Sequence, residues 1–340
     1  MPLAAIFDCE GPRLSDAERA FFKDVDPWGF IVFARHCASP DELRAHCDEL
    51  RESVGREDAP ILIDQEGGRV ARAKGVGFPD HHPPAVFGAL RRLDPKKAKQ
   101  AARINAYLIA RMVSDCGVNV NCVPMLDVPQ PDADQVVLGD RVIALHQDTI
   151  AELGAEVIEG TLQGGALPVI KHLPGHGRTL CDSHYDLPVV SARREDLQTV
   201  DFAPFRALND TALGMTAHVV YEAYDKERCA TLSPIVINEV IRGEIGFDGL
   251  LMSDDLKMKA LGGAFDSRLR DSLDAGCDIG LCCNFSMEEK LESVKGARAL
   301  SGRAAERAET ALAQLRQIDR DDRSSNYEDL AALLKPVIAV

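Results

Sequence analysis

The sequence has no surplus of positive charge. Its 54 aspartates and glutamates outnumber its 39 lysines and arginines, so the 340 residues carry a formal net charge of -15. Proteins that bind nucleic acid neutralise phosphates with a basic surface, and this balance therefore argues against DNA or RNA as a partner. The acidity leaves open whether the protein is a monomer or a homodimer.

Long uncharged apolar runs are missing as well. No window reaches the length of a membrane span without a charge, so we expect no membrane partner. The N-terminal stretch MPLAAIFDCEG has no basic start and reaches Asp8 before an apolar run can develop. It predicts a strand instead of a signal peptide, and we expect a cytoplasmic protein.

The ten cysteines form no CxxC pair. Several of them, such as Cys9, Cys122 and Cys282, lie inside apolar runs, which favours buried reduced thiols over a disulfide framework. Two His-Cys dipeptides, at 36–37 and 46–47, have a composition that suits metal. They flank a helix predicted from Ser39 onwards, however, and we interpret them as surface residues of that region.

Eight short apolar runs are present, each followed by a polar or Gly/Pro break. They are AAIFD (4–8), GFIVFA (29–34), PILIDQE (60–66), VNVNCVPMLDV (118–128), LPVIKH (167–172), LGMTAHVV (213–220), GLLMSDD (249–255) and CDIGLCC (277–283). Amphipathic helical patterns separate many of them: SPDELRAHCDELRESV begins with Ser39 as a cap and Pro40 at the first helical position, and KKAKQAARINAYLIARMVSDCG ends at Gly117, a typical terminator.

Strands that are apolar throughout and alternate with amphipathic helices indicate a parallel sheet covered on both faces. Roughly eight such units predict the α/β class and a TIM-type (β/α)8 barrel. We expect one catalytic domain over residues 1–340, with roughly the last 40 residues as peripheral helices. The alternative is an open doubly wound sheet, but no GxGxxG or GxxxxGK[ST] loop follows any strand.

Reactive residues of such barrels lie at the carboxyl ends of the strands. Polar residues stand at or near the ends of several runs here, namely Asp64-Gln65-Glu66, Asp127, Lys171-His172, His218 and Asp254-Asp255. A chance scatter of polar residues would not favour strand ends so consistently. The sequence therefore predicts an enzyme.

The densest group of titratable residues is KHLPGHGRTLCDSHYDLP (171–188). His172 and His176 have HxxxH spacing, which suits a metal when both lie on a helix. The proline and glycines of this segment make a helix improbable, and we predict neither a metal site nor a purely structural loop. Catalysis is the favoured interpretation.

Within this segment, Asp182 precedes His184 by two residues. A carboxylate at that spacing can accept an imidazole N–H and raise the pKa of the ring, which yields a proton donor near neutral pH. The polar stretch 177–188 is long enough to move, so we expect His184 to enter the site with substrate. Asp254 would be its nucleophilic partner in a retaining glycoside hydrolysis. A compatible structural alternative is that Ser253-Asp254 caps a helix over DDLKMKAL.

Seven motifs then occur in the order typical of one enzyme family. They are DQEGGRV (64–70), GDR (139–141), KHLPGHG (171–177), DSH (182–184), MTAHVVY (215–221), GFDGLLMSDDLKM (246–258) and SLDAGCD (272–278). Over about residues 5 to 285 the chain resembles the bacterial β-N-acetylglucosaminidases of glycoside hydrolase family 3, single-domain cytoplasmic enzymes of peptidoglycan recycling. DQEGGRV alone indicates family 3 broadly, and KHLPGHG with DSH is typical of the N-acetylglucosaminidases.

The resemblance implies a retaining exo-enzyme that removes terminal β-linked GlcNAc from fragments such as GlcNAc-1,6-anhydroMurNAc and its peptides. In the family's pattern Asp254 matches the nucleophile, His184 the acid/base on a mobile loop, and Asp182 the partner of that histidine. The positions that match sugar-binding residues are Asp64, Arg72, Arg141, Lys171 and His172, with His218 at the same rim. His176 matches a brace of the loop, and the family needs no metal or organic cofactor.

The chain departs from the family pattern at Leu173, where phenylalanine is usual, and after Arg141, where VIALHQD replaces an aromatic-containing segment. Three other functions remain: a family-3 β-glucosidase or xylosidase, which commonly carries a second α/β domain; a GlcNAc phosphorylase, since a histidine tolerates phosphate; and a sugar-binding protein, which would be expected to lose Asp254 or His184. Substrate-assisted hydrolysis would use Asp254 and Asp255 together, but neighbours on a strand point to opposite faces.

Overall fold

The centre of the protein is a closed barrel of eight parallel strands. The computed structural model describes residues 1–131, 133, 138–179, 187–318 and 326–338. Around the barrel the strands are β1 (Leu3–Phe7), β2 (Pro27–Val32), β3 (Ile61–Ile63), β6 (Val120–Asn121), β7 (Leu167–Leu173), β9 (Leu213–Thr216), β11 (Leu250–Asp255) and β12 (Ile279–Cys282), and β12 pairs with β1. Each predicted run overlaps one barrel strand, which confirms the single-domain (β/α)8 fold.

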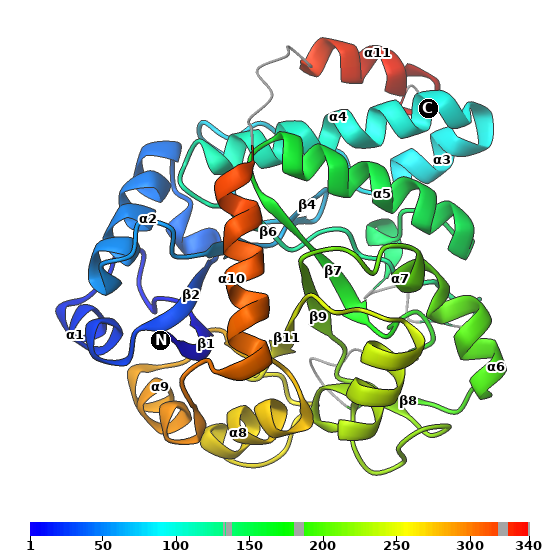
Figure 1. Ribbon diagram of the computed structural model, residues 1–340. Helices are drawn as coiled ribbons and strands as arrows, with labels where there is room; N and C mark the ends of the chain where they lie inside the picture. The colour runs from blue at the N-terminus through cyan, green and yellow to red at the C-terminus, as the bar shows by residue number, and fades with distance from the viewer. Residues whose placement is uncertain (132, 134–137, 180–186, 319–325, 339–340) are drawn as a thin grey trace.

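Helices surround this barrel (Figure 1). They are α1 (Asp16–Val25), α2 (Pro40–Val54), α3 (Ala85–Leu93), α4 (Pro95–Ser114), α5 (Gln147–Gln163), α6 (Arg194–Asp196), α7 (Ala203–Ala207), α8 (Phe265–Ala275), α9 (Met287–Ser293), α10 (Gly302–Gln317) and α11 (Tyr327–Ile338). Two π-helical segments (Leu197–Asp201 and Val236–Glu244) and four 3-10 turns (Ala34–His36, Gly139–Arg141, Ala230–Leu232 and Val294–Gly296) complete the helical structure of the described residues.

Local signals explain where the helices begin and end. Ser39 caps α2 by accepting the Glu42 N–H at 3.2 Å, and Pro40 is the first helical residue, as predicted. The chain leaves α4 through Gly117, whose φ of 92° is accessible to glycine without strain. Strand β7 is buried along its whole length, because side chains fill the barrel on one face and helices cover the other.

The two His-Cys dipeptides are buried, so their interpretation as surface residues was wrong. His46 and Cys47 lie on the inner face of α2 with Leu43 and Leu50, and the His46 ring stacks on the His36 ring with centroids 4.6 Å apart. The spacing 43, 46, 47, 50 is that of an apolar helical stripe, which predicts burial for all four positions. Nine cysteines fall in the described part of the chain, and all nine are free and buried, as expected.

The helix expected to start at Ser253-Asp254 is also absent from the described residues that follow. Strand β11 continues to Asp255, residues 256–261 form turns and a bend, and the next helix, α8, begins at Phe265. The Ser253 hydroxyl instead accepts the Leu281 N–H of β12 at 2.9 Å.

Two short strand pairs lie beyond the carboxyl ends of the barrel strands. An antiparallel hairpin pairs β4 (Gln65–Gly67) with β5 (Val70–Ala71), and a parallel pair joins β8 (Val189–Val190) to β10 (Val220–Tyr221). Helix α11 packs against α3 and α4 (Figure 1). In the described ranges, no helix combines the length and the apolarity that crossing a membrane requires.

Candidate active site

The carboxyl ends of the barrel strands surround a cavity of about 300 Å³. Six of the predicted site residues line it: Asp64, Arg72, Arg141, Lys171, His172 and Asp254. The cavity is also lined by three acidic residues and a histidine that sequence reasoning did not assign to substrate or catalysis: Glu66, Asp127, Asp255 and His176. The predicted Asp182 and His184 lie outside the described residues, and so does most of the stretch 177–188 that was expected to be mobile.

Lys171 lies between two carboxylates. Its ammonium is 2.9 Å from Asp64 Oδ1 and 2.8 Å from Glu66 Oε1. Glu66 also accepts two hydrogen bonds from Arg141, from Nε at 3.0 Å and from Nη2 at 2.8 Å. Burial opposes ionisation of Glu66, but Lys171 and Arg141 outweigh it and lower the pKa of this carboxyl. The network therefore keeps both cations charged and fixed at the cavity wall.

The hairpin after β3 returns Arg72 to Asp64. Their Nη2 and Oδ2 atoms lie 3.4 Å apart, and the Gln65 side chain accepts the Arg72 N–H at 2.8 Å. Gly67 makes this turn feasible, with a φ of +95° and the His82 carbonyl oxygen only 2.3 Å from where a Cβ would be. The EGG sequence thus places Glu66 and Arg72 on opposite arms of one short hairpin.

Asp127 orients both histidines of the KHLPGH segment. Its Oδ2 is 2.7 Å from His172 Nδ1, and its Oδ1 accepts the His176 N–H at 2.6 Å. Because a carboxylate accepts, the proton of this contact is on His172 Nδ1. Burial lowers the pKa of His176 to about 4, so its ring is neutral near pH 7. The expected bracing role of His176 agrees with its 3.0 Å contact from Nδ1 to the Thr179 hydroxyl.

Asp254 faces the cavity from the end of β11. Burial opposes ionisation of this carboxyl, but His172, His218, the Asp255 N–H and Lys171 outweigh burial, and the pKa of Asp254 is lowered. Its Oδ1 accepts the Asp255 N–H at 2.8 Å. A carboxylate held ionised in a partly dry cavity can act as a nucleophile.

Asp255 lines the same cavity, which differs from the expectation that strand alternation would keep it out. The pairing of β11 with β12 shifts register between Met252 and Asp255, so the regular alternation is interrupted there. The Asp255 carboxylate is nevertheless occupied, since its Oδ1 accepts the N–H groups of Lys257 at 2.9 Å and Cys283 at 3.2 Å. Burial raises the pKa of Asp255 to about 7.

His218 lies behind the cavity wall and is fully buried. Its Nδ1 is 2.7 Å from the Thr231 hydroxyl and its Nε2 is 3.0 Å from the Asp255 carbonyl oxygen. Both ring nitrogens therefore have protein partners. The strand-end position of His218 in the sequence could not reveal this, because the partners come from residues far along the chain.

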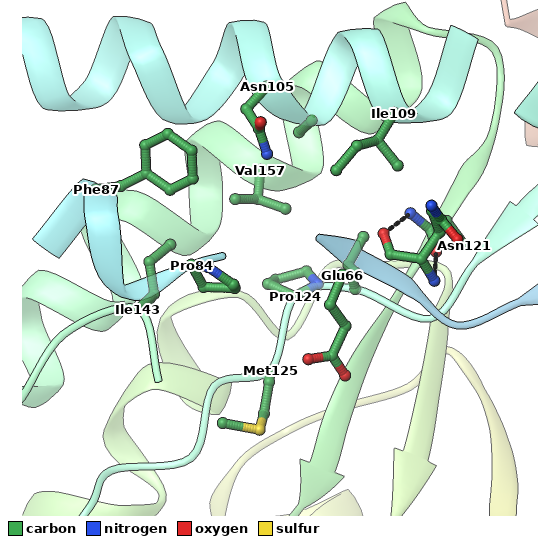
Figure 2. Close-up of a pocket in the computed structure, with 13 residues that line it drawn as sticks. Glu66, Pro84, Phe87, Asn105, Ile109, Asn121, Pro124, Met125, Ile143 and Val157 are labelled. Carbon is green, nitrogen blue, oxygen red and sulfur yellow. Dashed lines mark hydrogen bonds between the residues drawn. The ribbon is translucent and has the colours of Figure 1, made fainter. Parts of the chain in front are cut away.

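A small apolar hollow of about 30 Å³ lies on the other side of Glu66. Figure 2 shows Phe87, Ile109, Ile143 and Val157 around it, with the Glu66 carboxylate turned away from them. The aliphatic stem of Glu66 thus contacts apolar side chains while its carboxylate faces Lys171 and Arg141. Such surroundings strengthen the ion pairs because they exclude water.

The cavity combines fixed cationic donors, a carboxylate acceptor at Asp64 and an ionised carboxylate at Asp254. Donors and acceptors of this density suit the hydroxyl groups of a sugar. Within the described ranges, no three or more His, Cys, Asp or Glu residues are arranged to hold a metal ion.

Comparison with known proteins gives consistent matches. Residues 7–316 match the model of the glycosyl hydrolase family 3 N-terminal domain. A β-hexosaminidase of Alkalilimnicola ehrlichii is 38% identical over 279 residues, covering 81% of this chain and 79% of that protein. A β-hexosaminidase of Methylococcus capsulatus is 35% identical over 322 residues and covers 93% of both chains.

Solved structures agree with these sequence relatives. NagZ from Neisseria gonorrhoeae, in complex with N-trifluoroacetyl-D-glucosamine, superposes with a TM-score of 0.85 at 28% identity and 98% coverage of both chains. A family 3 β-N-acetylglucosaminidase from Paenibacillus gives a TM-score of 0.84 at 28% identity, with 98% of this chain and 66% of that one covered.

Proposed function

Because the chain belongs to glycoside hydrolase family 3 and is a β-N-acetylhexosaminidase of the NagZ type, we propose that it cleaves terminal β-linked GlcNAc from peptidoglycan fragments. The proposed substrates are GlcNAc-1,6-anhydroMurNAc and its peptides, and the proposed location is the cytoplasm. The curated relatives are named β-hexosaminidases, and the motif set of the sequence supports the peptidoglycan substrate.

The proposed mechanism is retaining, with two displacements at C1 of the GlcNAc ring. In the first step, the Asp254 carboxylate forms a bond to C1 while His184 donates a proton to the departing glycosidic oxygen. In the second, His184 removes a proton from water, the water oxygen bonds to C1, and Asp254 leaves as a carboxylate. Asp182 orients His184, and both of these assignments rest on the DSH motif.

The observation that carries this proposal is the position of Asp254 in the cavity wall at the end of β11. There its neighbours lower the pKa of the carboxyl although burial opposes its ionisation. A nucleophilic carboxylate must be ionised before it attacks. The neighbours that outweigh burial are part of the same cavity wall, and one of them, His172, is itself oriented by Asp127.

The remaining predicted residues have proposed roles in binding the sugar. Asp64, held by Lys171 and Arg72, would accept hydrogen bonds from sugar hydroxyls. Lys171, Arg141 and Arg72 would donate to them, and His172 would present its Nε2 side. His218, whose two ring nitrogens are occupied by protein atoms, is proposed to act through Asp255 instead of touching the sugar.

The test compares p-nitrophenyl β-GlcNAc with p-nitrophenyl β-glucoside, using wild type and Asp254→Asn. We expect turnover of the GlcNAc substrate only, and a loss of roughly 10³-fold or more in the variant. A 5-fluoro GlcNAc fluoride should add one glycosyl group to wild type, detected on the Asp254 peptide by mass spectrometry. Turnover of the glucoside with equal efficiency, or an active Asp254→Asn enzyme, would refute the proposal.

Two further measurements separate the finer alternatives. Assays in phosphate and in phosphate-free buffer should both release free GlcNAc, whereas accumulation of GlcNAc-1-phosphate would identify a phosphorylase. Purified GlcNAc-1,6-anhydroMurNAc peptides should be cleaved with a higher kcat/KM than chitobiose. The reverse preference would contradict the peptidoglycan substrate.

A further inference from the structure

The backbone of Asp255 is held from both sides. Its N–H donates to Asp254 Oδ1 at 2.8 Å, and its carbonyl oxygen lies 3.0 Å from His218 Nε2. A peptide carbonyl only accepts hydrogen bonds, so His218 Nε2 carries a proton. Burial lowers the pKa of His218 and so favours the neutral ring. In a neutral ring that is protonated at Nε2, Nδ1 is an acceptor.

Thr231 donates the hydrogen bond that the Nδ1 acceptor of this tautomer requires. Its Oγ1 is 2.7 Å from His218 Nδ1, whereas the competing acceptor, the Ala217 carbonyl, is farther away at 3.2 Å. A hydroxyl has one proton, and the proton given to His218 leaves the Thr231 oxygen free to accept from the Thr216 hydroxyl, 2.8 Å away. The hydrogen bonds thus run in one direction, from Thr216 through Thr231 and His218 to Asp255.

This relay is dry and joins separate parts of the chain. Thr216, Thr231 and His218 are each 0% exposed. Thr216 ends β9, Thr231 lies in the 3-10 turn Ala230–Leu232, and Asp255 ends β11. Because these side chains are closed to bulk solvent, solvent does not replace the Thr231 hydroxyl as hydrogen-bond donor to Nδ1. The tautomer of His218 therefore depends on Thr231.

We propose that Thr231 is a positioning residue for the nucleophile: its hydroxyl selects the His218 tautomer that fixes the Asp255 peptide and, through it, the Asp254 carboxylate. This inference rests on the proposed nucleophilic role of Asp254. Without the hydroxyl, the imidazole proton can move to Nδ1. The bare Nε2 then faces the Asp255 carbonyl oxygen, and two lone pairs repel where one hydrogen bond had held the peptide.

The fold around the nucleophile survives that change. The Asp255 carboxylate still accepts the N–H groups of Lys257 and Cys283, and valine fills nearly the same volume as threonine. The expected consequence is a small rotation of the Asp255 peptide that misaligns Asp254. A displacement on the order of 1 Å in an active site can reduce the rate about 100-fold.

The test compares Thr231→Val with Thr231→Ser on p-nitrophenyl β-GlcNAc. We expect Thr231→Val to lower kcat by about 10- to 100-fold with KM little changed. The thermal midpoint should also fall, because the buried His218 Nδ1 and the Thr216 hydroxyl lose Thr231 as a hydrogen-bond partner. Thr231→Ser retains the hydroxyl and should restore most of the rate. A Thr231→Val enzyme with wild-type kcat, an effect confined to KM, or equal losses in both variants would overturn the proposal.

The His218 tautomer can be measured without any variant of Thr231. The experiment is ¹⁵N NMR of ¹⁵N-histidine-labelled wild type at pH 7.5, with His218→Gln used for assignment. We expect that one ring nitrogen of His218 is protonated, and that it is Nε2. A proton on Nδ1, or on both nitrogens, would overturn the relay even if Thr231→Val fails to fold. Failure of the proposed function is recognised separately, by an inactive wild type or an active Asp254→Asn enzyme.

Discussion

Lys171 and Glu66 form an ion pair that is almost completely closed to solvent. Their Nζ and Oε1 atoms are 2.8 Å apart, and the two side chains are 3% and 1% exposed. Neither partner can recover hydration if the other is removed. Loss of either charge should therefore affect both the stability of the barrel and the geometry of the candidate active site.

Glu66→Gln should both destabilise the protein and impair the enzyme. Removing one member of a buried ion pair leaves an uncompensated charge and reduces the free energy of unfolding by about 3–5 kcal/mol. Urea denaturation measures this effect, and Glu52→Gln, an exposed position on α2, is the matched control. Equal midpoints for the two variants would show that the pair contributes nothing to stability.

Asp127→Asn should impair catalysis through the orientation of His172 and not through loss of folding. The amide keeps the shape of the carboxylate but has no charge to hold His172 Nδ1–H, and the imidazole loses its fixed tautomer. We expect kcat/KM for the GlcNAc substrate to fall by roughly 100-fold. Asp225→Asn removes another carboxylate that accepts backbone N–H groups. Asp225 is not one of the described residues that line the cavity, and kcat/KM of this variant should stay near the wild-type value.

Stability should fall as the pH is lowered from 6.5 to 4. Burial lowers the pKa of four histidines to values between about 3 and 4: His36, His46, His81 and His176. In this window the unfolded chain binds protons that the folded protein excludes, so acid favours unfolding. The buried carboxyls Asp201 and Asp255, whose pKa values are raised to about 6 and about 7, act in the opposite direction.

His46 allows one of these contributions to be measured. Its two ring nitrogens have no hydrogen-bond partner among the described residues, so His46→Phe removes a proton-binding group without breaking a polar contact seen there. The pH dependence of the unfolding free energy between pH 4 and 6.5 should become shallower by up to about 1.4 kcal/mol per unit. Leu43→Ala, on the same buried face of α2, should lower stability equally at every pH.

Gly67→Ala should disrupt the hairpin that carries Glu66 and Arg72. A Cβ there would meet the His82 carbonyl oxygen at 2.3 Å, in a backbone conformation with φ of +95°. Gly55→Ala isolates the conformational effect, because its φ is +64° and no atom of the described residues lies within 4 Å of the added Cβ. We expect about 1–2 kcal/mol of destabilisation for Gly55→Ala and a larger loss, together with a raised KM, for Gly67→Ala. Identical behaviour would contradict the steric argument.

The fold was predictable because apolar runs of this kind occur in few other architectures. A continuous stretch such as LPVIKH must be buried on both faces, and eight such stretches alternating with helices permit few architectures. The barrel geometry then brings strand ends together, which is why Asp64, Lys171, His172 and Asp254 could be grouped from positions far apart in the sequence.

The sequence was less informative where a side chain's partner decides its role. Glu66 and Asp127 were visible at strand ends, but their functions depend on a hairpin and a loop whose paths follow from tertiary contacts. His218 was assigned to the substrate because its motif matches the sugar-binding rim of the family, whereas Thr231 and Asp255 occupy both of its nitrogens. The burial of His46 is different, since the helical stripe through Leu43 and Leu50 already indicated it.

The enclosure of Lys171 and Glu66 also bears on the response to ionic strength. Salt screens charges that are separated by water, over a distance of about 8 Å at physiological concentrations, but it does not penetrate a pair whose side chains are at most 3% exposed. The acidic exterior and the more exposed Arg72–Asp64 pair should respond to salt, while the Lys171–Glu66 pair should not. The position of the Lys171 ammonium in the cavity wall should therefore stay the same over a wide range of salt concentrations.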